Sequence, residues 1–269
     1  MNSSGYQITR EVSLTEKTAE RVRTKAIVFG ATGLVGRNIL RQTCESGRYD
    51  LVVAIVRNEL DADRLSEMIP DMTARLRLRQ IRCSPADLAD PDIISQIFQT
   101  TPDGKIVHVY CALGTTMKSA GSKEAFRRVD HDLVVAAARF ARNIGAQRFI
   151  WVSSIGADEK SRTSFYLKVK GETESDIAKL TERKSSPRAI AVRPSLLLGE
   201  REETRVAEGV GQLLGRVIKP ALIGPAKHYK PIAASEVAAA MIELAFDEFS
   251  HPFLAYERVS TQREEMSPA

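Results

Sequence analysis

Between residues 25 and 195, short apolar runs alternate with longer segments in which apolar residues recur every three or four positions. A short, continuously apolar run is typical of a parallel strand buried on both faces, and the longer spacing is typical of an amphipathic helix. Strands are predicted at 26–30, 51–57, 76–83, 105–113, 148–154 and 188–194. Helices are predicted from near Gly33, over 125–145 with Gly145 as C-terminal cap, and over 165–182. This alternation predicts an α/β fold with a doubly wound parallel sheet.

The segments outside this alternation set the expected domain boundaries. Residues 1–24 are polar and are interpreted as an N-terminal arm, with a short helix over 14–23. Residues 25–260 are expected to form a single domain, and 196–260 would contribute a small C-terminal substrate-side region. Residues 261–269 are interpreted as a flexible tail. A chain of 269 residues buries enough surface to fold without a disulfide or a metal.

Composition and charge exclude several classes of protein. The net charge of +5 is not gathered into a basic stripe interleaved with aromatic residues, so we expect no nucleic-acid partner. No apolar run of about 18 residues is present, so we expect no membrane partner. The three cysteines, Cys44, Cys83 and Cys111, are far apart and lie in no Cys/His cluster, which argues against a disulfide framework and a metal site. Free thiols predict a reducing, cytoplasmic setting.

A glycine pattern follows the first predicted strand, in "FGATGLVGRN" (29–38). Gly30 would allow a tight turn, Gly33 would let backbone N–H groups approach a pyrophosphate, and Gly36 would let the helix pack on the strand. The positive end of the helix dipole would face the phosphates. The residues expected to bind a dinucleotide here are Gly30, Thr32, Gly33, Leu34, Val35, Gly36 and Arg37.

The end of the second strand distinguishes between the two nicotinamide dinucleotides. A carboxylate there would hold the ribose 2′-hydroxyl of NAD, but the chain has Arg57 followed by Asn58. A guanidinium suits the 2′-phosphate of NADP, so NADP(H) is predicted over NAD(H), although Glu59 is close by. After the third strand, Asp87 and Leu88 are expected beside the adenine, and capping a turn is an equally good interpretation of Asp87.

An acid–base set is predicted at the end of the fifth strand and the start of the next helix. Tyr166 and Lys170 are four residues apart and therefore share one helix face, and Ser154 ends the strand before them. Carbonyl reduction needs a hydride donor and an acid for the forming alkoxide. Tyr166 would transfer the proton, Lys170 would favour the phenolate and bind the nicotinamide ribose, and Ser154 would orient the carbonyl oxygen.

Several neighbouring residues have other interpretations. Ser153 and Ser154 point to opposite faces of the strand, so only one of them can face the site, and the sequence leaves open which one. Lys168, Glu172 and Glu174 are interpreted as solvated helix surface. No metal spacing is present among the histidines, which are interpreted as structural or surface residues: His108, His131, His228 and His251.

Four motifs together resemble the short-chain dehydrogenase/reductase superfamily over residues 25–240. "GATGLVGR", "WVSSIGAD", "FYLKVKGETE" and "AVRPSLLLGERE" are most similar to the atypical branch that contains the HIV Tat-interactive protein and its bacterial relatives. The resemblance implies a Rossmann-type fold, NADP(H) binding and a catalytic centre of Ser154, Tyr166 and Lys170.

The same resemblance implies further cofactor contacts. Ala112, Leu113 and Gly114 in "CALGTT" would pass the nicotinamide ribose, and "RPS" (193–195), with Pro194 and Ser195, would close beside the nicotinamide. Ser153 is also expected to bind the cofactor. The wider superfamily often completes a proton relay with an asparagine in the helix after the fourth strand. This chain has Asp130 in that region, which departs from the pattern.

Three functions are consistent with the sequence. The first is an NADP(H)-dependent oxidoreductase acting on a small carbonyl or alcohol substrate. The second is an NADP(H)-binding regulatory or redox-sensing protein with little turnover, which Asp130 and the weakly marked substrate region favour. The third is a nucleotide-sugar epimerase, against which the short C-terminal region argues. Arg201 and Arg205 could meet an anionic substrate or lie on a solvated helix face. The apolar spacing over 213–218 suits a core or an interface, such as that of a homodimer.

Overall fold

The computed structural model describes residues 24–83, 87, 106–182, 186–195, 197–198, 232–247 and 253–255. The expected arm helix at 14–23, the expected tail, and the segments that carry Arg201, Arg205 and the apolar spacing at 213–218 lie outside these residues.

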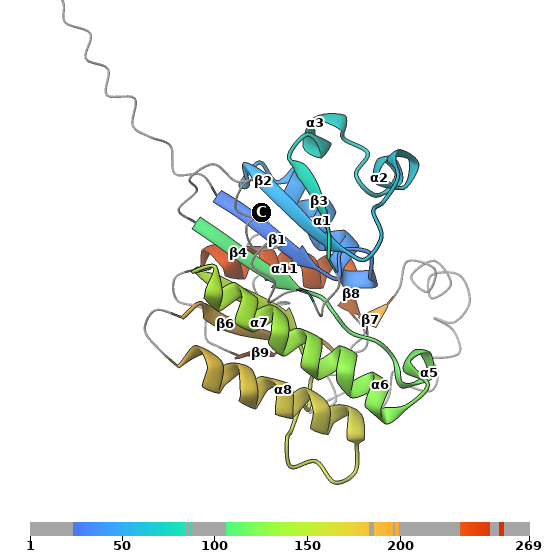
Figure 1. Cartoon of the computed structure of the whole chain (residues 1–269), viewed down its shortest axis with the longest axis vertical. Coiled ribbons are helices and arrows are strands. Elements are labelled where there is room, and N and C mark those ends of the chain that lie inside the picture. The colour runs from blue at the N-terminus through green and yellow to red at the C-terminus, as the bar shows by residue number, and fades with distance from the viewer. Residues whose placement is uncertain are drawn as a thin grey trace, which may run out of the picture.

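A seven-stranded parallel sheet forms the centre of the molecule (Figure 1). In spatial order its strands are β3 (Leu78–Arg82), β2 (Leu51–Val56), β1 (Thr24–Phe29), β4 (Ile106–Cys111), β5 (Arg148–Val152), β6 (Arg188–Arg193) and β9 (Phe253–Ala255). All six predicted strands are present, so the predicted Rossmann-type sheet is confirmed. The strand order reverses between β1 and β4, and ligands of doubly wound sheets bind at the carboxyl side of such a switch point.

Helices cover both faces of the sheet. On one face lie α1 (Leu34–Glu45) and α11 (Ala234–Phe246), and on the other lie α7 (Leu133–Asn143) and α8 (Phe165–Thr181), side by side in front of the sheet in Figure 1. The strand side chains alternate between the two cores, as a sheet buried on both sides requires. Val28 packs with the α1 side, for example, and Phe29 with the α7 side.

Shorter elements connect these layers. They are α2 (Ala62–Met68), α3 (Met72–Arg75), α5 (Met117–Ala120), α6 (Lys123–Arg127) and a separate two-stranded sheet of β7 (Leu197–Leu198) and β8 (Ile232–Ala233). Helix α11 comes from the segment expected on the substrate side, yet its apolar face packs against α1 in the core. This helix therefore contributes to the domain itself.

The helix predicted over 125–145 contains a feature that its periodicity does not show. A π-helical turn at Arg128–Asp132 joins α6 to α7. It turns Asp130 and His131 toward the interior, where their exposed fractions are 1% and 8%. Such insertions occur often at functional sites. Gly145 ends the helix with a φ of +67°, which confirms the predicted cap.

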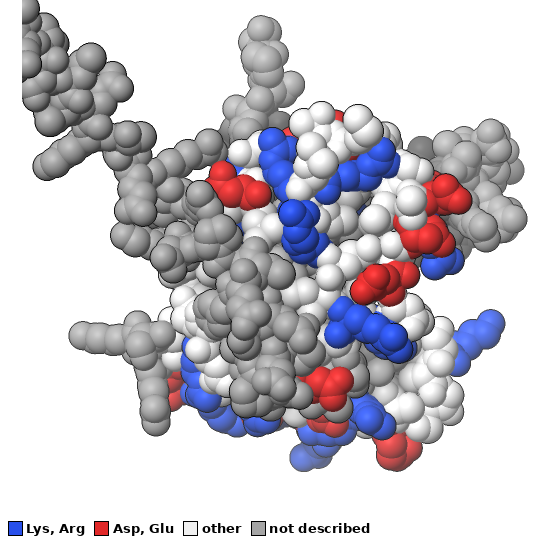
Figure 2. Space-filling model, turned by 45° about the horizontal axis from the view of Figure 1, so that its top comes forward, with Lys and Arg blue, Asp and Glu red and all other residues white. Residues whose placement is uncertain are grey.

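The described surface carries both signs of charge. On the face drawn in Figure 2, basic and acidic side chains are interspersed with uncharged residues. Within the described ranges, no helix has the length and apolar character needed to span a bilayer.

Candidate cofactor cleft and active site

The glycine loop after β1 is held by close backbone contacts. Gly30 has a φ of +74°, and a Cβ there would lie 2.7 Å from the carbonyl oxygen of Ala112. A Cβ on Gly36 would lie 1.9 Å from the carbonyl oxygen of Gly30, so only glycine lets α1 approach the loop this closely. The N–H of Gly33 donates to the Gly30 carbonyl at 2.9 Å. These contacts give the first and third glycines the roles that the sequence predicts.

A cleft of about 300 Å³ opens at the carboxyl ends of β1, β2 and β4. Seven of the residues predicted to bind the cofactor line it: Gly30, Thr32, Gly33, Arg57, Ala112, Leu113 and Gly114. Helix α1 points its N-terminus here with no acidic residue in its first turn and no side-chain cap at Gly33. Free backbone N–H groups and an uncompensated dipole suit a pyrophosphate, so these residues fit a dinucleotide.

Arg37 lies on a different side of the glycine loop from the cleft. It lines a second cavity of about 290 Å³ together with Arg41, Arg64 and Glu67, and Thr32 lines both cavities. Neither Arg41 nor Arg64 belongs to the glycine pattern, so the sequence carries no signal that points to them.

The other predicted cofactor residues have different surroundings. Val35 is buried in α1, Leu34 packs on the same core, and Asp87 is exposed. Pro194 is buried and Ser195 half-buried after β6, while Leu88 lies outside the described residues. Their contacts with a cofactor remain predictions.

Lys170 is held by a buried ion pair. Its Nζ lies 2.8 Å from Oδ1 of Asp130 and donates to the carbonyl of Val152 at 3.4 Å. The side chains of Lys170 and Asp130 are 4% and 2% exposed. Oδ2 of Asp130 accepts from the backbone N–H of Thr115 at 2.8 Å. Asp130 therefore connects the loop that lines the cofactor cleft to the lysine of the predicted catalytic set.

Tyr166 lies one helical turn before Lys170 and is half-buried. Its ring packs on Phe126 with the centroids 5.7 Å apart. Ser154 is also half-buried, and its Oγ donates to the carbonyl of Ile155 at 3.2 Å. Among the described residues no hydrogen bond joins Ser154, Tyr166 and Lys170 directly, so the structure brings the three to one end of β5 and α8 without linking them.

Ser153 is buried on the opposite side of the strand from Ser154. Its exposed fraction is 2%, and its Oγ donates to Oε1 of Glu174 at 2.5 Å. Because this hydroxyl is engaged in the interior, Ser154 is the serine whose side chain is available to a substrate, and Ser153 can reach a cofactor only through its backbone.

The interpretation of Glu174 as solvated surface was wrong. Its exposed fraction is 6%, and its carboxylate accepts from Ser153 and twice from Arg193, once from Nε at 2.8 Å. The carboxylate raises the pKa of the Arg193 guanidinium. Tyr166, Lys170 and Glu174 recur at intervals of four, so the spacing itself could have indicated that Glu174 shares the inward face.

The neighbours of Glu174 on the helix are surface residues, as predicted. Lys168 is exposed, and Glu172 pairs with Arg127, whose side chain is 42% exposed. On α8, the surface residue Glu172 and the buried residue Glu174 are therefore only two positions apart.

The described histidines are structural. His108 is buried and shares one hydrogen bond with the Tyr49 hydroxyl, at 3.0 Å, and that hydroxyl also contacts Tyr110 at 2.5 Å. Burial lowers the pKa of His108 to about 4. His131 contacts Asp132 and Asp176. No group of residues able to hold a metal ion occurs within the described part, and His228 and His251 lie outside it.

This cleft and side-chain set define a dinucleotide-binding protein of the Rossmann class. Residues 30–248 match the family model described as NAD(P)H-binding, so the chain belongs to that family. The resemblance drawn from the sequence motifs is thereby confirmed.

Curated fungal relatives match most of the chain. "Protein FMP52, mitochondrial" of Debaryomyces hansenii is 32% identical over 224 residues, which are 82% of this chain and 87% of that protein. The protein of the same name from Coccidioides immitis is 33% identical over 81% of this chain and 84% of its own.

These names correct the expectation of a cytoplasmic setting, because they point to a mitochondrial one. The prediction failed because it relied on free thiols. All three cysteines are buried, and burial raises the pKa of Cys44 and Cys111 to about 12. Thiols isolated in this way stay unpaired in any compartment, so they carry no information on location.

Solved structures share the fold at low sequence identity. MoeE5 in complex with UDP-glucose and NAD has a TM-score of 0.56 and 17% identity, with 91% of this chain and 82% of that one covered. A short-chain dehydrogenase from Streptomyces avermitilis has a TM-score of 0.55 and 16% identity, with 92% and 94% covered. At these identities the similarity shows the fold alone.

Proposed function

We propose that the protein is an NADP(H)-dependent oxidoreductase that interconverts a carbonyl and an alcohol on a small molecule. The observation that carries the proposal is the chain of contacts that runs from the cofactor cleft to Lys170, one helical turn from Tyr166. The cleft-lining residue Thr115 bonds to Asp130, Asp130 pairs with Lys170, and Lys170 lies one helical turn from Tyr166.

Each residue has a role in this reaction. A bound nicotinamide would supply the hydride. The Tyr166 hydroxyl gives its proton to the carbonyl oxygen as negative charge develops there, and Ser154 Oγ orients that oxygen. Lys170 is fixed by Asp130 and Val152, so its ammonium stays in one position, on the helix face that Tyr166 shares one turn earlier.

Arg57 supports the preference for NADP(H). It is exposed on the rim of the cleft, directly after β2, where the 2′-position of the adenosine ribose is read in this fold. Its guanidinium can form two hydrogen bonds to a phosphate. The coarser conclusion, an NAD(P)-binding protein, does not depend on Arg57.

Removal of the tyrosine hydroxyl tests the proposal. Tyr166→Phe keeps the ring that packs on Phe126 and removes the proton donor. We expect NADPH oxidation with a panel of aldehydes and ketones to fall by at least about 100-fold, within the range for general acid catalysis, with cofactor affinity nearly unchanged. Normal turnover by the Phe variant would contradict the role of Tyr166.

One observation favours a second function, an NADP(H)-dependent regulator with little turnover. Asp130 stands where the superfamily often has asparagine, and it neutralises Lys170 at 2.8 Å. A regulator would bind NADPH tightly while the whole carbonyl panel gives no turnover. The mitochondrial names of the curated relatives favour the mitochondrion for either function, and subcellular fractionation tests this location.

A further inference from the structure

We infer that the substrate of the proposed reaction carries an anionic group, a carboxylate or a phosphate, which binds in a basic pocket where α8 begins. The inference rests on the proposed function, because it assigns the substrate class of the same site. The pocket is lined by Lys123, Glu159, Lys160, Ser161, Arg162, Thr163, Phe165 and Lys168.

The charge of this pocket is the first observation. Four basic side chains and one carboxylate line it, so its formal charge is 4 − 1 = +3. Lys168 lies 3.9 Å from Glu172, whereas Lys160 and Arg162 form no ion pair among the described residues, and both are exposed. The first turn of α8 holds no acidic residue, and its cap, Ser164, is uncharged, so no carboxylate of the first turn offsets the positive end of the helix. A concave surface of one sign attracts ligands of the opposite sign.

The second observation is that the loop carrying these charges is fixed in place. The N–H of Asp158 donates to the carbonyl of Leu167 at 3.1 Å, and the N–H of Ile155 donates to Pro194 at 3.0 Å. On α8, a Cβ at Gly171 would lie 2.1 Å from the backbone nitrogen of Glu159. The loop therefore lies directly against the helix, and its position is set before any ligand arrives. Figure 1 shows it extending below the start of α8.

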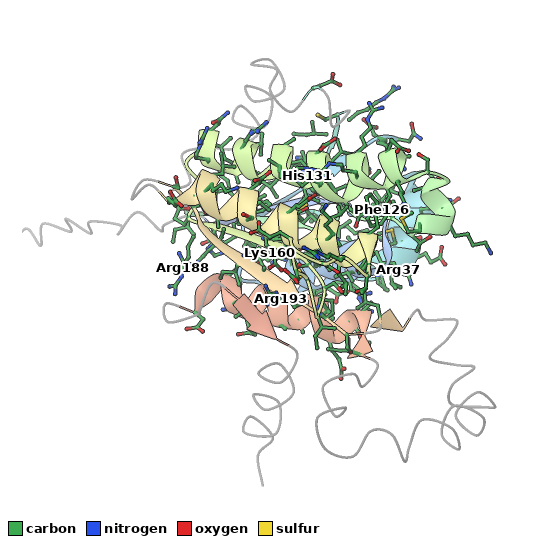
Figure 3. The ribbon with its side chains drawn as sticks, turned by 90° about the horizontal axis from the view of Figure 1, so that it is seen from below. Arg37, Phe126, His131, Lys160, Arg188 and Arg193 are labelled. Atoms are coloured by element: carbon green, nitrogen blue, oxygen red, sulfur yellow. The ribbon has the colours of Figure 1, made fainter. Side chains whose placement is uncertain are left out.

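The third observation connects the pocket to the proposed catalytic residue. Phe165 lines the pocket and Tyr166 follows it in the chain. The fully buried ring of Phe126 contacts both, with centroids at 6.1 Å from Phe165 and 5.7 Å from Tyr166. Lys123 lies over the Phe165 ring at 5.4 Å. Figure 3 labels Phe126 and Lys160, which come from α6 and from the loop before α8. A substrate with its carbonyl at Tyr166 can therefore extend its other end to these cations.

Two matched aldehydes test the inference. The probes are 4-carboxybenzaldehyde and its neutral methyl ester, and the readout is the ratio of kcat/KM for NADPH oxidation. We expect the protein to favour the carboxylate by at least about fivefold, the effect of one well-placed exposed ion pair. The double variant Lys160→Gln/Arg162→Gln should lose this preference. The control Arg139→Gln/Arg142→Gln, which removes the same charge from α7, should keep it.

The outcomes separate the inference from the proposed function. If both aldehydes are reduced without preference, or if the preference survives in the double variant, the inference of an anionic substrate is wrong. The proposed oxidoreductase function is then still supported. Should neither aldehyde react, calorimetric titration of 4-carboxybenzaldehyde into the protein with NADP⁺ decides the matter. If the parent protein binds 4-carboxybenzaldehyde and the double variant does not, the anionic pocket is supported, although the proposed oxidoreductase function fails. Absence of binding overturns the pocket, as does binding that the double variant retains.

Discussion

Because the carboxylate of Glu174 is buried, we expect its removal to lower the stability of the protein more than removal of the nearby carboxylate of Glu172 on the same helix. Glu174→Gln removes the charge that holds Arg193 and Ser153, and Glu172→Gln removes the same charge two residues away. The first carboxylate is 6% exposed and the second is 25% exposed, against an arginine that is 42% exposed. The two substitutions are chemically identical, so any difference between them comes from burial.

The magnitudes follow from the two environments. Breaking a buried ion pair costs about 3–5 kcal/mol because the remaining charge stays uncompensated. The Arg193 side chain is 29% exposed, and water reaches part of it, so for Glu174→Gln we expect a loss below that range, about 2 kcal/mol. For Glu172→Gln we expect about 0.2–1 kcal/mol, the range for exposed pairs.

Urea denaturation followed by tryptophan fluorescence measures both variants. The single tryptophan, Trp151, is 1% exposed in β5, two residues from Ser153, so its emission reports on this part of the core. The loss of about 2 kcal/mol expected for Glu174→Gln corresponds to roughly 4–8 °C in the melting temperature of a chain of this size. Equal losses of stability in the two variants would refute the assignment of Glu174 as a buried anchor between α8, β5 and β6.

Three further predictions concern the cofactor and the core. Arg57→Ala should remove a preference for NADPH over NADH of at least about tenfold, measured by fluorescence titration, and equal affinities in the parent would contradict the assignment. Gly36→Ala should weaken NADPH binding by about 100-fold or more, because its Cβ would lie 1.9 Å from the Gly30 carbonyl oxygen and must displace the loop. His108 has its pKa lowered from 6.5 to about 4 by burial, helped by Arg148 and Arg48, so the unfolded chain takes up a proton first as the pH falls. Stability should therefore drop by up to about 3 kcal/mol between pH 6.5 and 4, and urea denaturation of His108→Gln should lack this part of the pH dependence.

The sequence determined the sheet and the cofactor loop because both depend on local pattern. A strand buried on two faces must be apolar throughout. The start of α1 lies so close to the glycine loop at Gly36 that only glycine fits there. These requirements are written in consecutive residues, so the six strands and the residues of the glycine loop could be read directly from the chain. The four-residue spacing of Tyr166 and Lys170 belongs to the same class, since it depends on one helix alone.

The tertiary structure decided which partners those residues have. Lys170 pairs with Asp130 because a π-helical turn, invisible in the apolar periodicity, rotates Asp130 inward. Glu174 and Arg193 are 19 positions apart in the sequence and form an ion pair in the fold. Nothing in the residues around Glu174 indicates which arginine will neutralise it. Ion pairs between distant segments form only when packing brings their elements together, whereas the apolar run of a buried strand and the spacing of Gly30 and Gly36 are local in the sequence. For this reason the sequence determined where the site lies, and only the packed structure showed how its charges are balanced.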